Sequence, residues 1–285
     1  MKPARFEYVA AESADEAVSV LAEHGHDAAL LAGGQSLVPL MNMRMARPGV
    51  VIDLNRVREL DTIRLDGVLE VGALVRQARA QRAPEVAEAA PIVVSAIGQI
   101  GHPAIRSRGT IGGNVAHADA SSELPAVLVA LGAEIVARGA GGTRSIPAEA
   151  FFVTHFTTAL SGELLTHVRI PRAEPGVSAA FVEVARRHGD FALVGAAARV
   201  RVGADGTCAE ARLVLSGVAG APFRAARAEE AIVGRRLDDA SALADVERLV
   251  RDEVSPTSDV HATAAYRKRV AGVLVRRSLE QAAPR

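Results

Sequence analysis

The sequence predicts an α+β protein, in which strands and helices alternate at first and are then segregated. Three observations support this prediction. Residues 6–54 read as a strand, a helix and two further strands, residues 58–170 mix short strands with helices, and residues 179–282 read as three strands followed by three helices. With 285 residues, 49% of them hydrophobic, the chain can bury cores of this kind. We therefore expect a soluble globular protein.

The N-terminal unit is expected to place a glycine loop at the end of a strand. A capping box, Ser13-Ala14-Asp15-Glu16, starts a helix that Gly25 ends. The loop 32–37 follows the second strand and so leaves its carboxyl end, where open α/β sheets bind ligands. The expected strands cover residues 6–9, 28–31 and 50–54.

In the middle of the chain the clearest element is a helix over residues 124–131. Ser121 or Ser122 would cap its N-terminus and Gly132 its C-terminus. Strands are expected at 133–138 and 163–170, on either side of a glycine-rich turn at 139–142. The other expected elements are a strand pair at 58–69, helices at 73–80 and 92–97, and a short helix at Phe151-Phe152.

The last part of the chain begins after a turn-rich stretch at residues 171–176, which marks a boundary. Three strands and then three helices predict a separate α+β layer. The strands are expected at 179–185, 194–202 and 211–217, and the helices at 225–234, 241–254 and 263–282. In the N-terminal part, the methionines at 41, 43 and 45 are expected to pack as core, with contact to a cofactor or a partner as the alternative.

Two glycine pairs are the strongest candidates for a ligand site. Gly33-Gly34 follows an apolar run, and Gly112-Gly113 follows Thr110-Ile111. A glycine pair lets the backbone turn sharply and expose consecutive N–H groups where no Cβ blocks a ligand, which is how a loop binds phosphate. Two such loops can hold the two halves of one pyrophosphate, although each alone also fits a tight turn. A dense polar run follows the second pair: Asn114, His117, Asp119, Ser121, Ser122 and Glu123.

Composition argues against several classes of protein. Thirty-three basic and 33 acidic residues give a formal net charge of zero, so no whole-chain field attracts nucleic acid or an anionic membrane. No apolar run approaches the roughly 18 residues of a membrane span, and the expected location is the cytoplasm. The only cysteine, Cys208, cannot build a disulfide or an iron–sulfur cluster by itself. His117, Asp119 and Glu123 lack the further ligands of a metal site, so none is expected.

The motifs together resemble a known family. Ala32-Gly33-Gly34-Gln35-Ser36, Thr110-Ile111-Gly112-Gly113-Asn114 and the run from Ala116 to Pro125 are similar to the FAD-binding medium subunit of molybdenum hydroxylases. That family includes the flavoprotein of carbon monoxide dehydrogenase and the flavin domain of xanthine dehydrogenase. The resemblance spans nearly the whole chain, since it continues at Met43-Arg44, residues 51–55, residues 186–192 and Tyr266-Arg267.

The resemblance implies a fold and its division. The FAD-binding fold would be of the vanillyl-alcohol-oxidase (PCMH) type, made of two subdomains, with an added C-terminal α+β domain of three strands and a helical layer. The expected boundaries are 1–57 for the first FAD-binding subdomain and 58–174 for the second. Residues 175–285 would form the C-terminal domain of the carbon monoxide dehydrogenase flavoprotein type.

The resemblance also implies which residues bind FAD. The two glycine loops would bind the pyrophosphate, and the polar run would contact ribityl or ribose hydroxyls or the flavin edge. Asp119 and Glu123 could instead be solvated or capping carboxylates, and Ile100, Leu164 and Phe191 could be plain core. The implied cofactor-binding residues are Ala32, Gly33, Gly34, Gln35, Ser36, Leu37, Ile100, Thr110, Ile111, Gly112, Gly113, Asn114, Asp119, Ser122, Glu123, Leu164 and Phe191.

The implied function is that of an electron-transfer subunit in a multi-subunit oxidoreductase. In the family, a large molybdopterin subunit oxidises the substrate and a small subunit with 2Fe–2S clusters relays electrons to FAD, which delivers them to NAD, a quinone or another acceptor. The assembly would be a dimer of heterotrimers, a heterohexamer. The flavin carries the redox chemistry, so no side chain of this chain is expected to be catalytic.

Two other functions stay open from the sequence. One is a self-contained FAD-dependent oxidase or reductase that binds its substrate with residues 176–285, although that region shows no cluster of acid, base or nucleophile residues. The other is a non-enzymatic scaffold with relic glycine loops. The substrate of a complex, whether carbon monoxide, a purine, another N-heterocycle or an aldehyde, is chosen on another chain.

Overall fold

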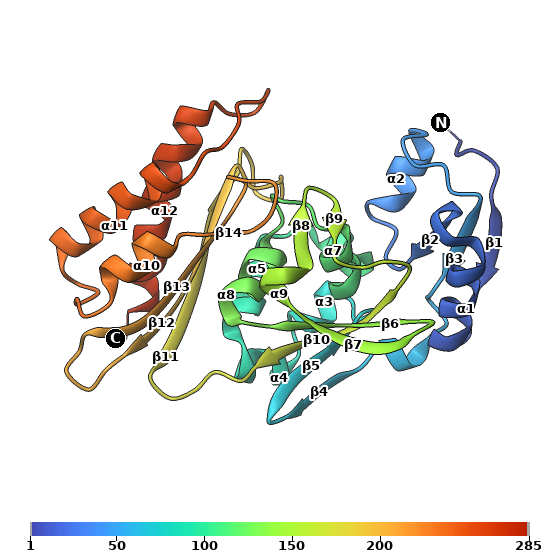
Figure 1. Ribbon diagram of the computed structural model, residues 1–285, viewed down its shortest axis with the longest axis horizontal. Helices are drawn as coiled ribbons and strands as arrows, with labels where there is room; N and C mark the ends of the chain where they lie inside the picture. The colour runs from blue at the N-terminus through green and yellow to red at the C-terminus, as the bar shows by residue number, and fades with distance from the viewer. Residues whose placement is uncertain (1, 284–285) are drawn as a thin grey trace.

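The N-terminal unit is a three-stranded parallel sheet with one covering helix, as a computed structural model of the chain shows for residues 2–283 (Figure 1). Ser13 Oγ accepts a hydrogen bond from the Glu16 amide at 3.1 Å, and Gly25 ends the helix at a φ of 54°, as the capping signals predict. The strands lie in the order β1-β3-β2, and the elements are β1 (Glu7–Ala10), α1 (Ala14–His24), β2 (Ala28–Leu31), a short α2 (Leu37–Asn42) and β3 (Val50–Asp53).

The expectation for the methionines is wrong in two of three cases. Met41 is buried on α2, but Met43 is 51% and Met45 73% exposed. The chain between α2 and β3 turns over a positive φ of 60° at Arg44, so the residues on either side of that turn leave the core surface. Two large apolar side chains therefore face outwards close to the first glycine loop.

A five-stranded antiparallel sheet follows, in the order β4-β5-β10-β6-β7. The glycine turn at 139–142 joins β6 to β7, and β10 pairs with the other edge of β6, so the expectation that the turn joins β6 and β10 is wrong. β7 could not be predicted from the sequence, because most of its residues are exposed and carry no apolar alternation. The strands are β4 (Ile63–Asp66), β5 (Val68–Gly72), β6 (Glu134–Gly139), β7 (Gly142–Pro147) and β10 (Leu164–Pro171).

Seven helices and a small hairpin accompany this sheet in the described part of the chain. Ser122 and Gly132 flank α8 as N-cap and C-cap, which confirms the predicted limits of that helix. The helices are α3 (Gln77–Ala80), α4 (Pro84–Ala89), α5 (Pro91–Gln99), α6 (Pro103–Arg108), α7 (Ile111–His117), α8 (Glu123–Leu131) and α9 (Ala148–Phe151), and the hairpin strands are β8 (Phe152–Thr154) and β9 (Thr157–Thr158).

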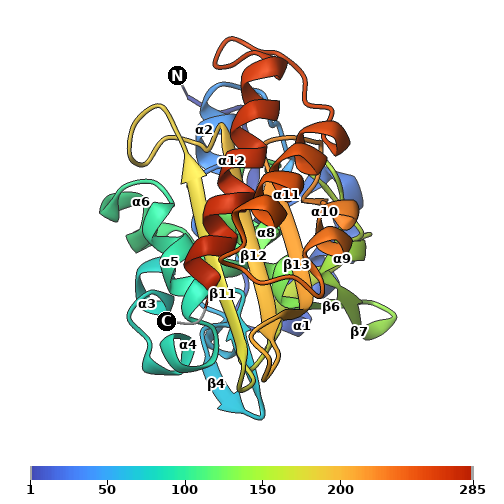
Figure 2. The ribbon, with the colours of Figure 1, turned by 90° about the vertical axis from the view of Figure 1, so that its left-hand side faces the viewer.

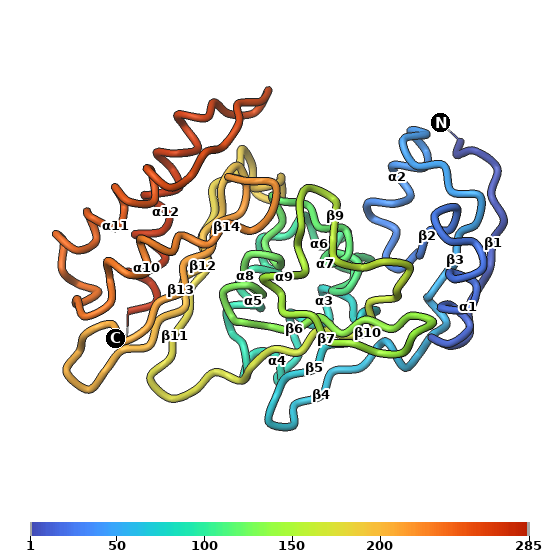
Figure 3. Tube along the Cα trace, viewed as in Figure 1, coloured from blue at the N-terminus to red at the C-terminus, as the bar shows by residue number. Residues whose placement is uncertain are grey.

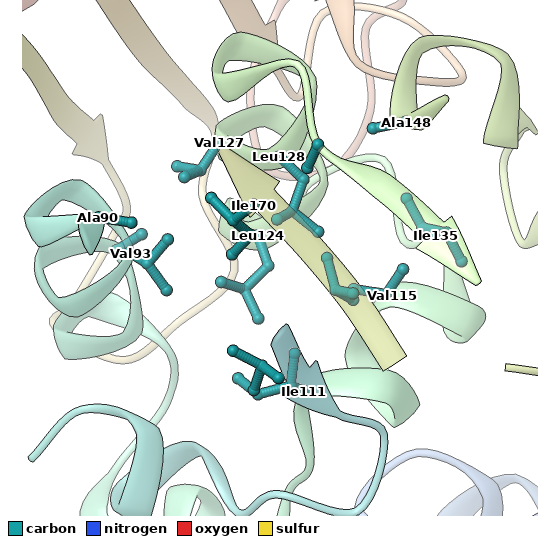
Figure 4. Close-up of a cluster of buried hydrophobic side chains, with 14 of the residues drawn as sticks. Ala90, Val93, Ile111, Val115, Leu124, Val127, Leu128, Ile135, Ala148 and Ile170 are labelled. Atoms are coloured by element: carbon teal, nitrogen blue, oxygen red, sulfur yellow. The ribbon is translucent and has the colours of Figure 1, made fainter. Parts of the chain in front are cut away.

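The main core lies around α8, which is buried from Glu123 to Ala130. Figure 4 shows Leu124, Val127 and Leu128 of α8 facing Val93 of α5 and Ile170 of β10. Ile111 and Val115 of α7 belong to the same cluster. Apolar contacts therefore hold α8 in place on several sides. Because α7 packs into the same cluster, the second glycine loop at the start of α7 has a rigid support.

The C-terminal part is a sheet with helices on one face and α8 on the other. Figure 2 shows α11 and α12 lying across this sheet, and α8 contacts β12 and β13 from the opposite side. Residues of β12 alternate between the two cores, Ala197 facing α8 and Ala196 and Ala198 facing the helices. The elements are β11 (Val177–Val184), β12 (Val194–Val202), β13 (Cys208–Ser216), β14 (Phe223–Arg224), α10 (Ala226–Ile232), α11 (Ala240–Glu253) and α12 (Ala264–Ala282).

The three sheets follow one another along the molecule. Figure 3 traces the chain from the N-terminal unit at one end, through the five-stranded sheet, to the C-terminal helices at the other end. The expected succession of three strands and three helices is confirmed, with β14 as a short addition. Among residues 2–283, no helix combines the length and the apolar character that crossing a membrane requires.

Candidate functional site

A cavity of about 530 Å³ lies where the N-terminal unit, the middle segment and the β11–β12 connection meet. Its volume falls within the roughly 300–1,000 Å³ that is usual for ligand pockets. Every residue implied by the resemblance lines this cavity except Ile111, which is buried beneath the second loop. The predicted residues at the cavity wall are Ala32, Gly33, Gly34, Gln35, Ser36, Leu37, Ile100, Thr110, Gly112, Gly113, Asn114, Asp119, Ser122, Glu123, Leu164 and Phe191.

The first glycine loop offers free backbone donors to the cavity. Within residues 2–283, the consecutive amides from Gly33 to Ser36 have no hydrogen-bond acceptor in the protein. Gly34 has a φ of 72°, and the Gln35 side chain donates to the Gly33 carbonyl at 3.2 Å, which holds the turn. A run of N–H groups that point into a concave turn forms an anion-binding nest. This loop therefore suits a phosphate group, as predicted from its residues.

The second glycine loop differs from the expectation, because its amides are used inside the protein. The amide of Gly112 donates to the Ala73 carbonyl at 3.0 Å, and the amide of Gly113 donates to Thr110 Oγ1 at 3.0 Å. Thr110 is the N-cap of α7, so the expected loop is the first turn of a helix. Its glycines permit close packing, since a Cβ on Gly112 would lie 2.5 Å from the Cβ of Ala73.

The two loops touch each other. A Cβ on Gly33 would lie only 2.4 Å from the Arg108 carbonyl oxygen and 2.9 Å from the Cα of Gly109, the residue directly before Thr110. Arg76 reinforces the contact, because its guanidinium donates at 2.5 Å both to the Arg108 carbonyl and to Asn55 Oδ1. Asn55 in turn donates to the Ala32 carbonyl at 3.0 Å. The cavity is thus closed on one side by a contact between distant parts of the chain.

The polar run after the second loop forms one wall of the cavity. Asn114 and Ser122 are joined by hydrogen bonds of 2.9 and 3.1 Å, and Asp119 Oδ1 accepts from the Ser121 amide at 2.8 Å. Glu123 is only 5% exposed. Burial, followed by the nearby carboxylate of Glu183, raises the pKa of Glu123 to about 8. This wall therefore presents a carboxyl group that is protonated at neutral pH in the free protein.

The β11–β12 connection forms the third wall and carries Phe191. This side chain is 68% exposed and lines the cavity, so the alternative of core packing is wrong for it. The connection lies against the segment before α6, because a Cβ on Gly189 would come within 2.8 Å of His102 Cε1. Ile100 and Leu164 are buried and line the cavity as well, which gives it an apolar lining beside the polar wall.

Sequence reasoning missed part of the cavity wall. Gly109, Leu165 and Asp190 are neighbours of predicted residues and could have been included on that ground. Gln77 is buried with Oε1 unpartnered among the described residues, and no local signal distinguishes it. The missed wall residues are Ala29, Leu30, Leu54, Ala73, Leu74, Gln77, Gly101, Ile105, Gly109, Ala116, His117, Leu160, Glu163, Leu165, Gly189 and Asp190.

Family models decide the relationship of this chain. Residues 4–173 match the FAD binding domain in molybdopterin dehydrogenase, and residues 179–282 match the CO dehydrogenase flavoprotein C-terminal domain. The chain belongs to the FAD-binding subunits of the molybdopterin dehydrogenase family. It is an oxidoreductase subunit, and its FAD-binding fold is confirmed.

Individual members of the family are similar over their whole length. The 6-hydroxypseudooxynicotine dehydrogenase complex subunit alpha of Paenarthrobacter nicotinovorans is 42% identical over 99% of this chain and 96% of that protein. The carbon monoxide dehydrogenase medium chain of Hydrogenophaga pseudoflava is 34% identical over 99% and 98%.

Solved structures agree with this assignment. A chain of carbon monoxide dehydrogenase from Hydrogenophaga pseudoflava has a TM-score of 0.95 at 36% identity and covers 99% of this chain and 98% of its own. A chain of quinoline 2-oxidoreductase from Pseudomonas putida 86 has a TM-score of 0.93 at 38% identity, with coverage of 99% and 98%.

The residues present fit the FAD of this family. Free amides at Gly33 to Ser36 suit a pyrophosphate, the glycines at 112 and 113 let the first turn of α7 pack closely at the facing wall, and Phe191 offers an exposed aromatic face at the third wall. Hydroxyl, amide and carboxyl groups on the polar wall can bond to a ribityl chain or a ribose. The cavity thus combines the anionic, polar and aromatic contacts that a flavin dinucleotide requires.

We expect Gly33→Ala to weaken FAD binding by at least about tenfold, because the new methyl group would meet a backbone oxygen that cannot rotate away and would push the two loops apart. The affinity is measured by quenching of FAD fluorescence on titration of the flavin-free protein. Gly141→Ala is the control, because a Cβ there meets no atom within 4 Å. Equal affinities of the two variants would contradict the role of the loop contact.

The raised pKa of Glu123 predicts a pH-dependent stability of the flavin-free protein. Between pH 4.5, its ordinary pKa, and about 8 the folded chain keeps the proton that the unfolded chain releases, so burial of Glu123 costs more stability as pH rises. We expect Glu123→Gln to gain stability over wild type across this window, by up to about 1.4 kcal/mol per pH unit.

Urea unfolding at about pH 5 and pH 8 measures this difference. Burial also raises the pKa of Glu183, to about 7, so Glu183 adds a pH dependence of stability of the same sign to wild type and variant alike. Glu230→Gln is the matched control, because Glu230 is exposed. Its free energy of unfolding should differ from that of wild type by the same amount at both pH values. A stability gap for Glu123→Gln that stays constant with pH would contradict the burial of a protonated carboxyl group.

Proposed function

We propose that this chain is the electron-transfer subunit of a molybdenum hydroxylase complex, in which its FAD receives electrons from iron–sulfur clusters of a partner and delivers them to NAD or a quinone. One observation carries the proposal. The chain covers nearly all of relatives named as medium chains or complex subunits, and its single cysteine, Cys208, is buried, so iron–sulfur clusters belong to other chains. Bound FAD supplies the redox chemistry.

The proposed partners are an iron–sulfur small subunit and a molybdopterin large subunit, assembled as a dimer of heterotrimers. Support comes from the relatives, which include medium chains of carbon monoxide dehydrogenase and of glyceraldehyde dehydrogenase. Exposed apolar side chains also gather on segments next to the cavity, at Met43, Met45, Phe156 and Phe191. Figure 1 shows these segments, after α2, between β8 and β9 and between β11 and β12, along one side of the molecule. Such apolar groups favour a protein interface.

We propose individual roles around the flavin from the geometry. The amides from Gly33 to Ser36 bind the pyrophosphate, and the wall from Asn114 to Glu123 bonds to hydroxyl groups of the cofactor. Phe191 lies against the isoalloxazine, and Ile100 and Leu164 make apolar contacts to it. The same proposal divides the chain into a first FAD-binding subdomain at 1–57, a second at 58–174 and the C-terminal domain at 175–285.

The substrate of the complex is proposed to bind elsewhere. Relatives of comparable identity are named for substrates as different as caffeine, glyceraldehyde and carbon monoxide. One kind of flavin-binding subunit does not discriminate among such molecules, whereas a separate oxidising subunit does. We therefore assign no catalytic acid, base or nucleophile to this chain.

The first test compares the isolated chain with the complex. The isolated chain is expected to take up one FAD non-covalently, with a flavin absorption spectrum, and to oxidise no small-molecule substrate such as an aldehyde or an N-heterocycle. Co-expression with the chains encoded beside it should yield a heteromer that does. Substrate turnover by the isolated chain would favour the self-contained oxidase, and failure to take up FAD would overturn the proposal.

The second test addresses the docking surface. Met45 is 73% exposed and does not line the cavity, so Met45→Asp should leave FAD content unchanged while it reduces co-purification of the iron–sulfur subunit by about tenfold or more. Val260→Asp is the control, because Val260 is 92% exposed on the segment between α11 and α12. Wild-type co-purification of the Met45 variant would place the interface elsewhere.

A further inference from the structure

Arg267 on α12 is a buried cation whose role the flavin site leaves unexplained. Its side chain is 8% exposed. One nitrogen, Nη1, donates to the Leu193 carbonyl at 2.5 Å and to the Gly217 carbonyl at 3.1 Å, and Nη2 donates to Asp259 Oδ2 at 2.6 Å. Asp259 is itself fixed by the amides of His261 and Ala262, at 2.8 and 2.9 Å. The guanidinium thus joins a helix, a loop and two strand ends.

Both carbonyls belong to segments that lead directly into the cavity wall. Leu193 lies two residues after Phe191, at the end of the β11–β12 connection. Gly217 follows β13, and its own amide donates to the Ala120 carbonyl at 2.8 Å, inside the polar wall between Asp119 and Ser122. Arg267 therefore donates hydrogen bonds to two segments at once, one that continues into the β11–β12 connection and one that is bonded to the polar wall.

The two segments are also packed directly on each other at this point. Gly217 has a φ of 75°, and a Cβ there would lie 2.5 Å from the Leu193 carbonyl oxygen. The Leu193 amide donates to the Val184 carbonyl at 2.8 Å, which anchors the connection to β11. The spacing between the Phe191 loop and the polar wall is thus set where Arg267 binds.

The chemistry of the site calls for arginine. Burying a cation costs free energy unless it is paired and hydrogen-bonded, and a planar guanidinium can serve two carbonyls and a carboxylate in fixed directions. An apolar residue would fill the same space but leave the Leu193 and Gly217 carbonyls without this donor. A lysine carries the charge without the planar fork and so reaches fewer of these acceptors.

We propose that Arg267 is a positioning residue that holds the Gly189–Phe191 loop and the Asp119–Glu123 segment at the separation which the flavin requires. The inference rests on the proposed contacts of these two walls with FAD. The C-terminal helix then takes part in the cofactor site without touching it, since Arg267 does not line the cavity. Arg267 of the Tyr266-Arg267 motif thus gains a role through its bonds to the Leu193 and Gly217 carbonyls.

The test uses backbone hydrogen exchange of the whole flavin-free chain, followed by FAD titration. In Arg267→Met we expect faster exchange in peptides covering residues 118–123 and 186–193, and FAD binding weakened by about tenfold. Arg267→Lys should recover part of both effects. Arg276→Met is the matched control on the same helix, because Arg276 is 42% exposed and its ion pairs among residues 2–283 are with the carboxylates of Glu247 and Glu280. This variant should exchange and bind FAD as wild type.

The two measurements test the positioning role of Arg267 and the flavin contacts of the two walls separately. Unchanged exchange in both peptides of Arg267→Met would overturn the positioning role, and faster exchange with unchanged FAD affinity would overturn the assignment of these walls to the flavin. If Arg267→Met does not fold, Asp259→Asn replaces it, since it keeps the guanidinium but removes its carboxylate; the same two peptides must then exchange faster. A failure of the proposed function is recognised separately, because wild-type chain would then take up no FAD.

Discussion

The contact between Gly33 and the backbone of Arg108 and Gly109 is the constraint on which the cavity depends. Only a residue without a side chain can approach that carbonyl so closely, and the approach brings a loop of the parallel sheet against a loop of the antiparallel sheet. Arg76 and Asn55 bond across the same junction. The N-terminal unit is thereby held as one wall of a cavity that neither unit forms alone.

The two glycine loops contribute different physical properties to the site. The first keeps its amides from Gly33 to Ser36 free of partners among residues 2–283, and it is the source of positive backbone dipole for an anion. In the second, the amides of Gly112 and Gly113 donate to the Ala73 carbonyl and to Thr110, the N-cap of α7, and the glycines allow this close packing. Similar sequence signals thus serve recognition in one place and packing in the other.

Buried charge links the cavity to the C-terminal layer. Burial raises the pKa of both Glu123 and Glu183, and the nearby Glu183 carboxylate disfavours ionisation of Glu123 further. On the other side of the same sheet, the buried guanidinium of Arg267 donates to two carbonyls and to Asp259, which offset part of its lost hydration. The C-terminal α+β layer therefore does more than cover the flavin domain. It carries the β11–β12 connection that forms the third wall, and through Glu183 it raises the pKa of Glu123 in the polar wall.

The features that local chemistry controls could be predicted from the sequence alone. Capping residues, glycines and apolar runs located α1, α8 and the strands of the C-terminal sheet, and the order of the motifs indicated the family and its FAD. The tertiary structure decided the rest, because it depends on contacts between residues far apart in the chain. Residues distant in the sequence decide whether the amide of Gly112 is free and what Arg267 binds. They also decide whether Met45 is buried. No local pattern encodes such distant partners.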